Sequence, residues 1–107
     1  MYFIEKGNPM HLWSPQLIIQ NDDCFVSFSI STPAEVYFLL GHPGSSDLVK
    51  SSKEIISLGF YGGIFAEEAS LYVGNLSNSG EYGLWIVMKD GETISQPYYY
   101  EFVIPSK

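Results

Sequence analysis

The stretch NLSNSGEYGLWIVMKDGETISQPYYYEFVIP, residues 75–105, decides the fold that this sequence predicts. Apolar and aromatic side chains occupy alternating positions on both sides of one turn, Lys89 to Glu92. A period of two is typical of β-strands, because successive side chains of a strand point to opposite faces. The stretch therefore predicts two antiparallel strands joined by a short turn.

Parity divides the side chains of these two strands between two faces. Glu101 should face water, so its neighbours Tyr100 and Phe102 should point inward. The predicted core set is Tyr82, Leu84, Ile86, Met88, Tyr100, Phe102 and Ile104. The predicted outward set is Trp85, Val87, Tyr99 and Val103. The outward set has no core to fill unless something covers it.

The same alternation recurs earlier in the chain. It is clearest in CFVSFSIS (residues 24–31) and EVYFLL (residues 35–40), and it returns in ASLYVGNL (residues 69–76). Residues 11–20 predict a strand that is broken at Pro15, since proline is confined to sheet edges and bulges. These segments predict strands separated by turns rich in Gly, Pro, Asn, Asp and Ser.

Glu54–Phe60 is ambiguous, because its apolar spacing allows one helical turn or a short edge strand. Ser and β-branched residues outnumber good helix formers there, which favours a strand. About seven short strands without a long helix predict an all-β fold, an antiparallel two-sheet β-sandwich. The length predicts one domain, residues 1–107, with residues 1–10 as an irregular N-terminal arm.

The spacing from Leu76 to Tyr82 resembles a known motif. Fibronectin type III domains carry L-x-P-x-T-x-Y before their penultimate strand, and Asn78 and Gly80 stand here in place of Pro and Thr. SGEY is also similar to the D-x-G-x-Y of immunoglobulin domains, with Leu84 where their Cys would follow. The resemblance implies an immunoglobulin-like or fibronectin type III-like sandwich. It also implies that Tyr82, with Leu76, forms a tyrosine corner whose hydroxyl bonds the backbone a few residues upstream.

Charge excludes several classes of partner. The chain is acidic, with a net charge of -7 and no Arg. Nucleic-acid binding depends on Lys and Arg at phosphates, and anionic lipids attract basic segments, so neither partner is expected. No apolar run reaches the roughly 18 residues that a membrane span needs. The resemblance favours an extracellular or cell-surface module over a cytoplasmic protein.

Residues with chemical reactivity are few, and none forms a recognisable motif. Cys24 is the single cysteine and has no His near it in sequence. The residues considered as metal ligands are Asn21, Asp22, Asp23, Glu67, Glu68, His11 and His42. Their spacing matches neither a calcium loop nor a zinc site. We therefore predict no catalytic residue, no metal and no cofactor.

The outer face is the candidate binding surface. In the sandwich that the resemblance implies, the strands at 35–40, 82–88 and 99–104 are neighbours in one sheet. Their outward side chains are Tyr37, Leu39, Trp85, Val87, Tyr99 and Val103. Either this face binds a partner, or the N-terminal segment with Leu12 and Trp13 folds over it and completes a core.

The predicted function is a non-catalytic interaction or assembly module, which binds a protein partner or forms a homodimer through this face. The alternative is a carbohydrate-binding or other ligand-binding module appended to an enzyme. In that case Trp85 with Tyr37 or Tyr99 would stack on a sugar ring.

Overall fold

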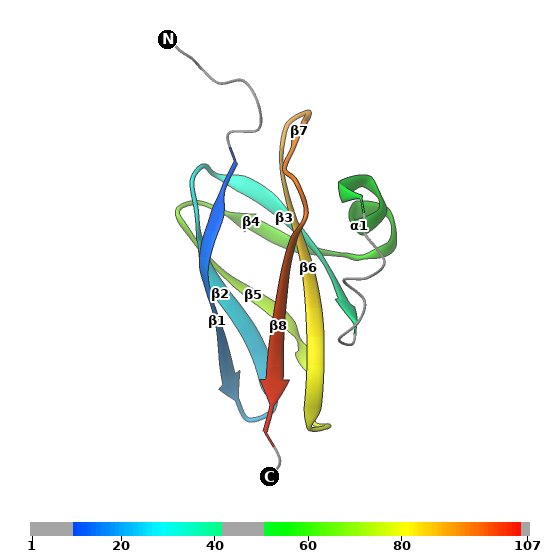
Figure 1. Cartoon of the computed structure of the whole chain (residues 1–107). Coiled ribbons are helices and arrows are strands. Elements are labelled where there is room, and N and C mark those ends of the chain that lie inside the picture. Colours follow the sequence, from blue (N-terminus) through cyan, green and yellow to red (C-terminus); the bar gives the residue numbers. More distant parts are fainter. Residues whose placement is uncertain (1–9, 42–50, 106–107) are drawn as a thin grey trace.

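The computed structural model describes residues 10–41 and 51–105 (Figure 1). Its elements in chain order are β1 (Leu12–Gln20), β2 (Asp23–Ile30), β3 (Ala34–Gly41), α1 (Ser52–Leu58), β4 (Phe60–Phe65), β5 (Glu68–Asn75), β6 (Gly80–Asp90), β7 (Thr93–Ile94) and β8 (Tyr98–Ile104). The predicted turn after β1 is a two-residue hairpin turn. Asn21 and Asp22 both have positive φ, 51° and 70°, which suits the twist of the flanking strands.

The strands form two antiparallel sheets, as the sequence predicted. One sheet has the order β1-β2-β5, and the other has the order β4-β3-β6. Both β7 and β8 pair with β6 on its side away from β3, at different ends of that long strand. The termini of the described chain lie at opposite ends of the molecule (Figure 1).

The hydrophobic core lies between the two sheets. In β2 every second residue is buried, including Val26, Phe28 and Ile30, because these side chains point toward the opposite sheet. The parity predicted for the last two long strands is confirmed. Leu84, Ile86, Met88, Phe102 and Ile104 are buried in this core, and Tyr82 and Tyr100 pack half-buried against it.

The prediction of a strand at Glu54–Phe60 is wrong, since α1 occupies most of that segment. A capping box starts the helix. The Glu54 backbone N–H donates to Ser51 Oγ (3.1 Å), and the Ser51 backbone N–H donates to Glu54 Oε1 (2.9 Å). Ile55 is completely buried against the sheet below. A seven-residue helix depends on such packing, so residue propensities alone pointed to the wrong structure.

The described part of the N-terminal segment, residues 10–20, does not cover the outer face of the β4-β3-β6 sheet. Leu12 and Trp13 lie in β1, which belongs to the other sheet. Met10, predicted to lie in an irregular arm, is buried in the core, while residues 1–9 lie outside the described residues. The Tyr98 hydroxyl donates to the Met10 carbonyl (3.2 Å), which ties β8 to β1 on that side of the sandwich.

Candidate functional site

Helix α1 covers the middle of the face that the sequence proposed as a binding surface. Figure 1 shows α1 on the side of the β4-β3-β6 sheet that is turned away from β1 and β2. Ile55 forms a second apolar cluster with Trp85 and Val87, against which Leu39 and Tyr99 pack half-buried. The middle of the face is therefore covered by α1, which is neither of the two alternatives that the sequence left open, a partner or the segment with Leu12 and Trp13.

Aromatic packing seals this second cluster. The rings of Trp85 and Tyr99 lie 4.8 Å apart, and Tyr99 lies so close over Gly83 that a Cβ there would collide with its hydroxyl. That hydroxyl donates to Glu101 Oε2 (3.0 Å). The indole nitrogen of Trp85 is buried and has no hydrogen-bond partner among residues 10–41 and 51–105. Trp85 is thus inaccessible to a protein or to a sugar ring while α1 is in place.

The six proposed face residues therefore have different surroundings. Trp85 and Val87 are buried, Leu39 and Tyr99 are half-buried under α1, and Tyr37 is half-buried beside β4. Val103 alone among them is well exposed, at 58%. The strand register places all six on one face of the sheet, but the structure uses the central ones as a core.

Apart from Val103, the exposed large apolar side chains of this sheet lie on β4, whose outer edge pairs with no other described strand. Phe60, Tyr61 and Ile64 are all more than half exposed, and Ile64 is the most exposed of them at 69%. The strand FYGGIF has no charged residue and no proline. Edge strands in soluble proteins are usually short, charged or covered, because their free N–H and C=O groups pair with other strands. An uncharged apolar edge therefore marks a candidate interaction surface.

A β-bulge controls which way the side chains of β4 point. Val36 of β3 pairs with Gly63 and Tyr37 pairs with Tyr61, so Gly62 is an extra residue. Without it Phe60 and Phe65, five residues apart, would lie on opposite faces. With it, they pair with Phe38 and Ala34 and share the core face. Tyr61 and Ile64 share the outer face for the same reason.

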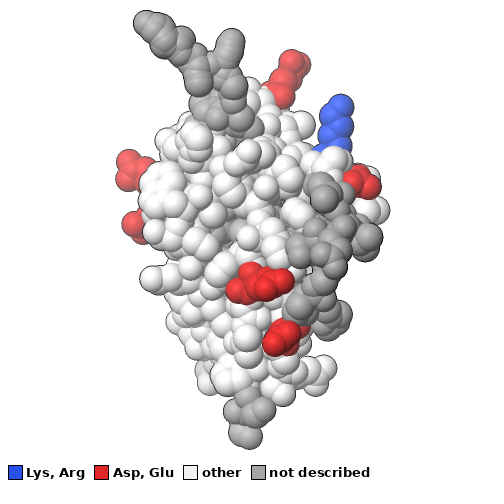
Figure 2. All heavy atoms as spheres, viewed as in Figure 1, with Lys and Arg blue, Asp and Glu red and all other residues white. Residues whose placement is uncertain are grey.

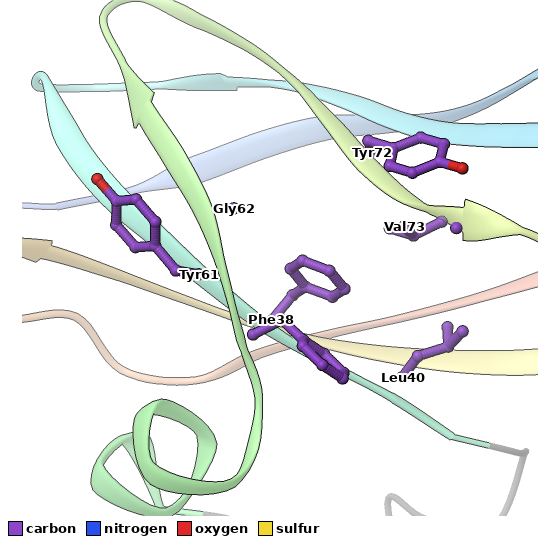
Figure 3. Close-up of a pocket in the computed structure, with 8 residues that line it drawn as sticks. Phe38, Leu40, Tyr61, Gly62, Tyr72 and Val73 are labelled. Atoms are coloured by element: carbon purple, nitrogen blue, oxygen red, sulfur yellow. The ribbon is translucent and has the colours of Figure 1, made fainter.

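A groove of about 410 Å³ runs beside this edge, where β4 and β5 leave the sandwich open. Its lining is mostly aromatic and apolar: Phe38, Leu40, Phe60, Tyr61, Tyr72 and Val73 (Figure 3). A hydrogen bond to the Asp23 carboxylate raises the pKa of Tyr72, and desolvation and then the Glu35 carboxylate raise the pKa of Tyr61. Both phenols stay neutral at ordinary pH, so they add no charge to the groove.

The described lining of the groove contains no carboxylate, thiol or imidazole. Asp23, one of the candidate metal ligands in the turn at residues 21–23, has a structural role. Its Oδ1 accepts hydrogen bonds from the Tyr72 hydroxyl (3.0 Å) and from Asn75 Nδ2 (3.1 Å). Cys24 is buried in the core. Across residues 10–41 and 51–105, no group of three or more His, Cys, Asp and Glu could hold a metal ion; His42 lies outside these ranges.

Charge is sparse on the face seen in Figure 2. Acidic groups stand singly or in small groups on a surface that is mostly uncharged, and a basic side chain is visible only at its upper right. Within the described part of the chain, no helix is long and apolar enough to cross a membrane.

Comparison with known proteins gives no relative. No family model, no curated protein and no solved structure matches this chain. A function therefore has to be inferred from the surfaces of the molecule itself. Sequence reasoning missed the β4 edge because the strand predicted at Glu54–Phe60 ended at the residue where β4 begins. The available signal was FYGGIF itself, six uncharged residues of which four are apolar or aromatic.

Proposed function

We propose that this chain is a non-catalytic assembly module, an immunoglobulin-like or fibronectin type III-like sandwich that associates with a second copy of itself through the edge of β4. The strand order supports the sandwich type, since β2 and β5 lie in one sheet and β3, β6 and β8 in the other. The corner bond supports it too. The Tyr82 hydroxyl donates to the Asn78 carbonyl (2.9 Å), and Leu76 packs against the core beside it.

The observation that carries self-association is the symmetry of β4. Its residues are FYGGIF, and the bulge places Phe60 with Phe65 on one face and Tyr61 with Ile64 on the other. A strand with this pattern is complementary to itself when it is turned around. In antiparallel pairing about Gly62 and Gly63, Phe60 lies opposite Phe65 of the second copy, and Tyr61 lies opposite Ile64.

Such pairing satisfies two requirements at once. The free backbone N–H and C=O groups of each edge find partners, and the cross-strand pairs bring apolar side chains together on both faces. The contact is isologous, so two copies close into a dimer with one sheet running through both. Because β4 has no charged residue, two copies that each carry -7 bring no like charges together on the paired strands themselves.

The test replaces Ile64 by lysine, which places a charge opposite the Tyr61 of a second copy. Val103→Lys is the matched control. Val103 is also an exposed outward aliphatic residue, and it lies on β8, at the other edge of the same sheet. Sedimentation equilibrium would measure the dimer dissociation constant of each protein. We expect Ile64→Lys to weaken association by about tenfold or more, and Val103→Lys by less than about threefold.

A wild-type chain that stays monomeric up to millimolar concentration would overturn the proposal. So would an Ile64→Lys variant that dimerises as well as the wild type. Equal weakening by both substitutions would indicate β4-to-β8 pairing, which forms open chains of molecules, and would overturn the closed dimer.

A further inference from the structure

An exposed tryptophan lies on the opposite sheet, on its outer face. Trp13 of β1 is 48% exposed and pairs with Ser29 of β2, which in turn pairs with Glu68 of β5. Gln16 and Ser27 form the adjacent pair on the same face. The cross-strand neighbours Trp13, Ser29 and Glu68 thus place one large aromatic ring at the margin of a polar patch, away from α1 and from β4.

A second bulge creates this arrangement. Two residues of β1, Ser14 and Pro15, lie between Trp13 and Gln16, where β2 has one residue. Residues three apart in a regular strand point to opposite faces, so the extra residue is what puts Trp13 and Gln16 on one face. Ser14 has φ 58°, although a residue before proline normally adopts an extended conformation. The chain holds an unfavourable conformation at this point.

A polar hollow of about 270 Å³ is lined by Ser14, the chain neighbour of Trp13, and by Ser29, its strand partner, so Trp13 stands at the margin of this hollow. Its polar side chains are Ser14, Gln16, Ser27, Ser29 and Glu68. None of these five side chains makes a hydrogen bond to another of the described residues. Four of them lie on paired strands, so their backbone positions are fixed before any ligand arrives. The hollow therefore presents unused hydroxyl, amide and carboxylate groups on a rigid sheet.

We propose that this hollow binds one ring of a neutral carbohydrate, with Trp13 stacking on the apolar face of that ring. Neutral hydroxyl and amide groups donate and accept hydrogen bonds, and the Glu68 carboxylate accepts them, as sugar hydroxyls require. The lining has no cation, and its one charge is negative, so an anionic ligand is disfavoured. Its largely polar lining likewise disfavours a lipid. This site is independent of the proposed assembly through β4.

The experiment is an NMR titration of the full chain with cellohexaose, mannohexaose and chitohexaose, each to about 10 mM, so that millimolar dissociation constants are detected. Polygalacturonate serves as the anionic comparison. Tyr72→Ala is the matched control for Trp13→Ala, because Tyr72 is also 48% exposed and lies on the outer face of the same sheet, at β5. Gln16→Ala provides a second variant in the hollow.

We expect one of the neutral oligosaccharides to bind and polygalacturonate not to bind. Trp13→Ala should weaken binding by about tenfold or more, while Tyr72→Ala should change it by less than about threefold. If Trp13→Ala does not fold, loss of binding in Gln16→Ala tests the same site. Absence of binding to all three neutral sugars, equal binding of the polyanion, or binding that neither variant in the hollow weakens would overturn the proposal.

Discussion

The Tyr82 hydroxyl makes a hydrogen bond to the backbone that leads into β6. It donates to the carbonyl of Asn78, four residues upstream, at 2.9 Å, and the Tyr82 ring stacks on Phe102 at 5.7 Å between centroids. The ring belongs to the core edge, while the hydroxyl holds the chain that leads into the strand. The two contributions are separable, because phenylalanine keeps the ring and removes the hydroxyl that donates to Asn78.

Tyr82→Phe should lower the free energy of unfolding by about 1 kcal/mol, the usual contribution of one hydrogen bond. Tyr100→Phe is the control. Its ring also packs on Phe102, at 5.9 Å, but its hydroxyl has no hydrogen-bond partner among the described residues. Urea unfolding of both variants measures the difference. Equal stability of the two would show that the Tyr82 hydroxyl contributes nothing and would remove one support for the proposed sandwich type.

Helix α1 acts as an element that turns one sheet surface into a second core. The capping box at Ser51 and Glu54 starts it, and the Ser52 hydroxyl donates to the Ser95 carbonyl (2.5 Å) near β7. One completely buried side chain, Ile55, makes the main apolar contact with Trp85 and Val87. The attachment of α1 therefore depends mainly on Ile55, with smaller contributions from the half-buried Ile56 and the Ser52 hydrogen bond.

Ile55→Ala should lower the free energy of unfolding by about 2–5 kcal/mol, because it leaves a cavity over the sheet. Leu58→Ala, on the same helix, changes a side chain that is mostly exposed and should cost within about 0.5 kcal/mol. Denaturant unfolding followed by far-ultraviolet circular dichroism compares the two. A small effect of Ile55→Ala would mean that α1 contributes little to stability and that the sheet face beneath it is available to partners.

At the scale of the whole molecule, net charge opposes the proposed dimer. Each copy carries -7, and pairing at an uncharged strand leaves that repulsion to act at longer range. Raising the salt concentration from about 0.01 M to about 0.1 M shortens the screening length from about 30 Å to about 10 Å. Association should therefore tighten.

Sedimentation equilibrium at the two salt concentrations should show the dimer dissociation constant falling by at least about twofold. Val103→Lys serves again as a control, because it reduces the net charge without touching β4 and should show a smaller salt effect. An association that weakens with salt would instead indicate ion pairs across the interface, which the uncharged β4 edge does not provide.

The local pattern of residues was sufficient for most of the fold. Alternation in β2, β6 and β8 predicted which side chains lie between the sheets, because strand period and hydrophobicity are both local properties. The Leu76-to-Tyr82 spacing identified the residue whose hydroxyl caps the start of β6. Parity also identified Trp85, Val87 and Tyr99 correctly as lying on the face away from the main core.

Only the tertiary structure decided which surfaces remain open. The sequence between residues 52 and 58 favours neither state strongly, and the helix forms because Ile55 finds Trp85 and Val87 to pack against. The bulges at Gly62 and at Ser14–Pro15 likewise depend on register with a neighbouring strand, and each reverses the parity that follows it. The sequence by itself determined two sheets and the side chains between them. Contacts between residues distant in the chain decide three further features: the helix over Trp85, the exposed edge of β4 and the position of Trp13 on the outer face. A local pattern does not contain those contacts.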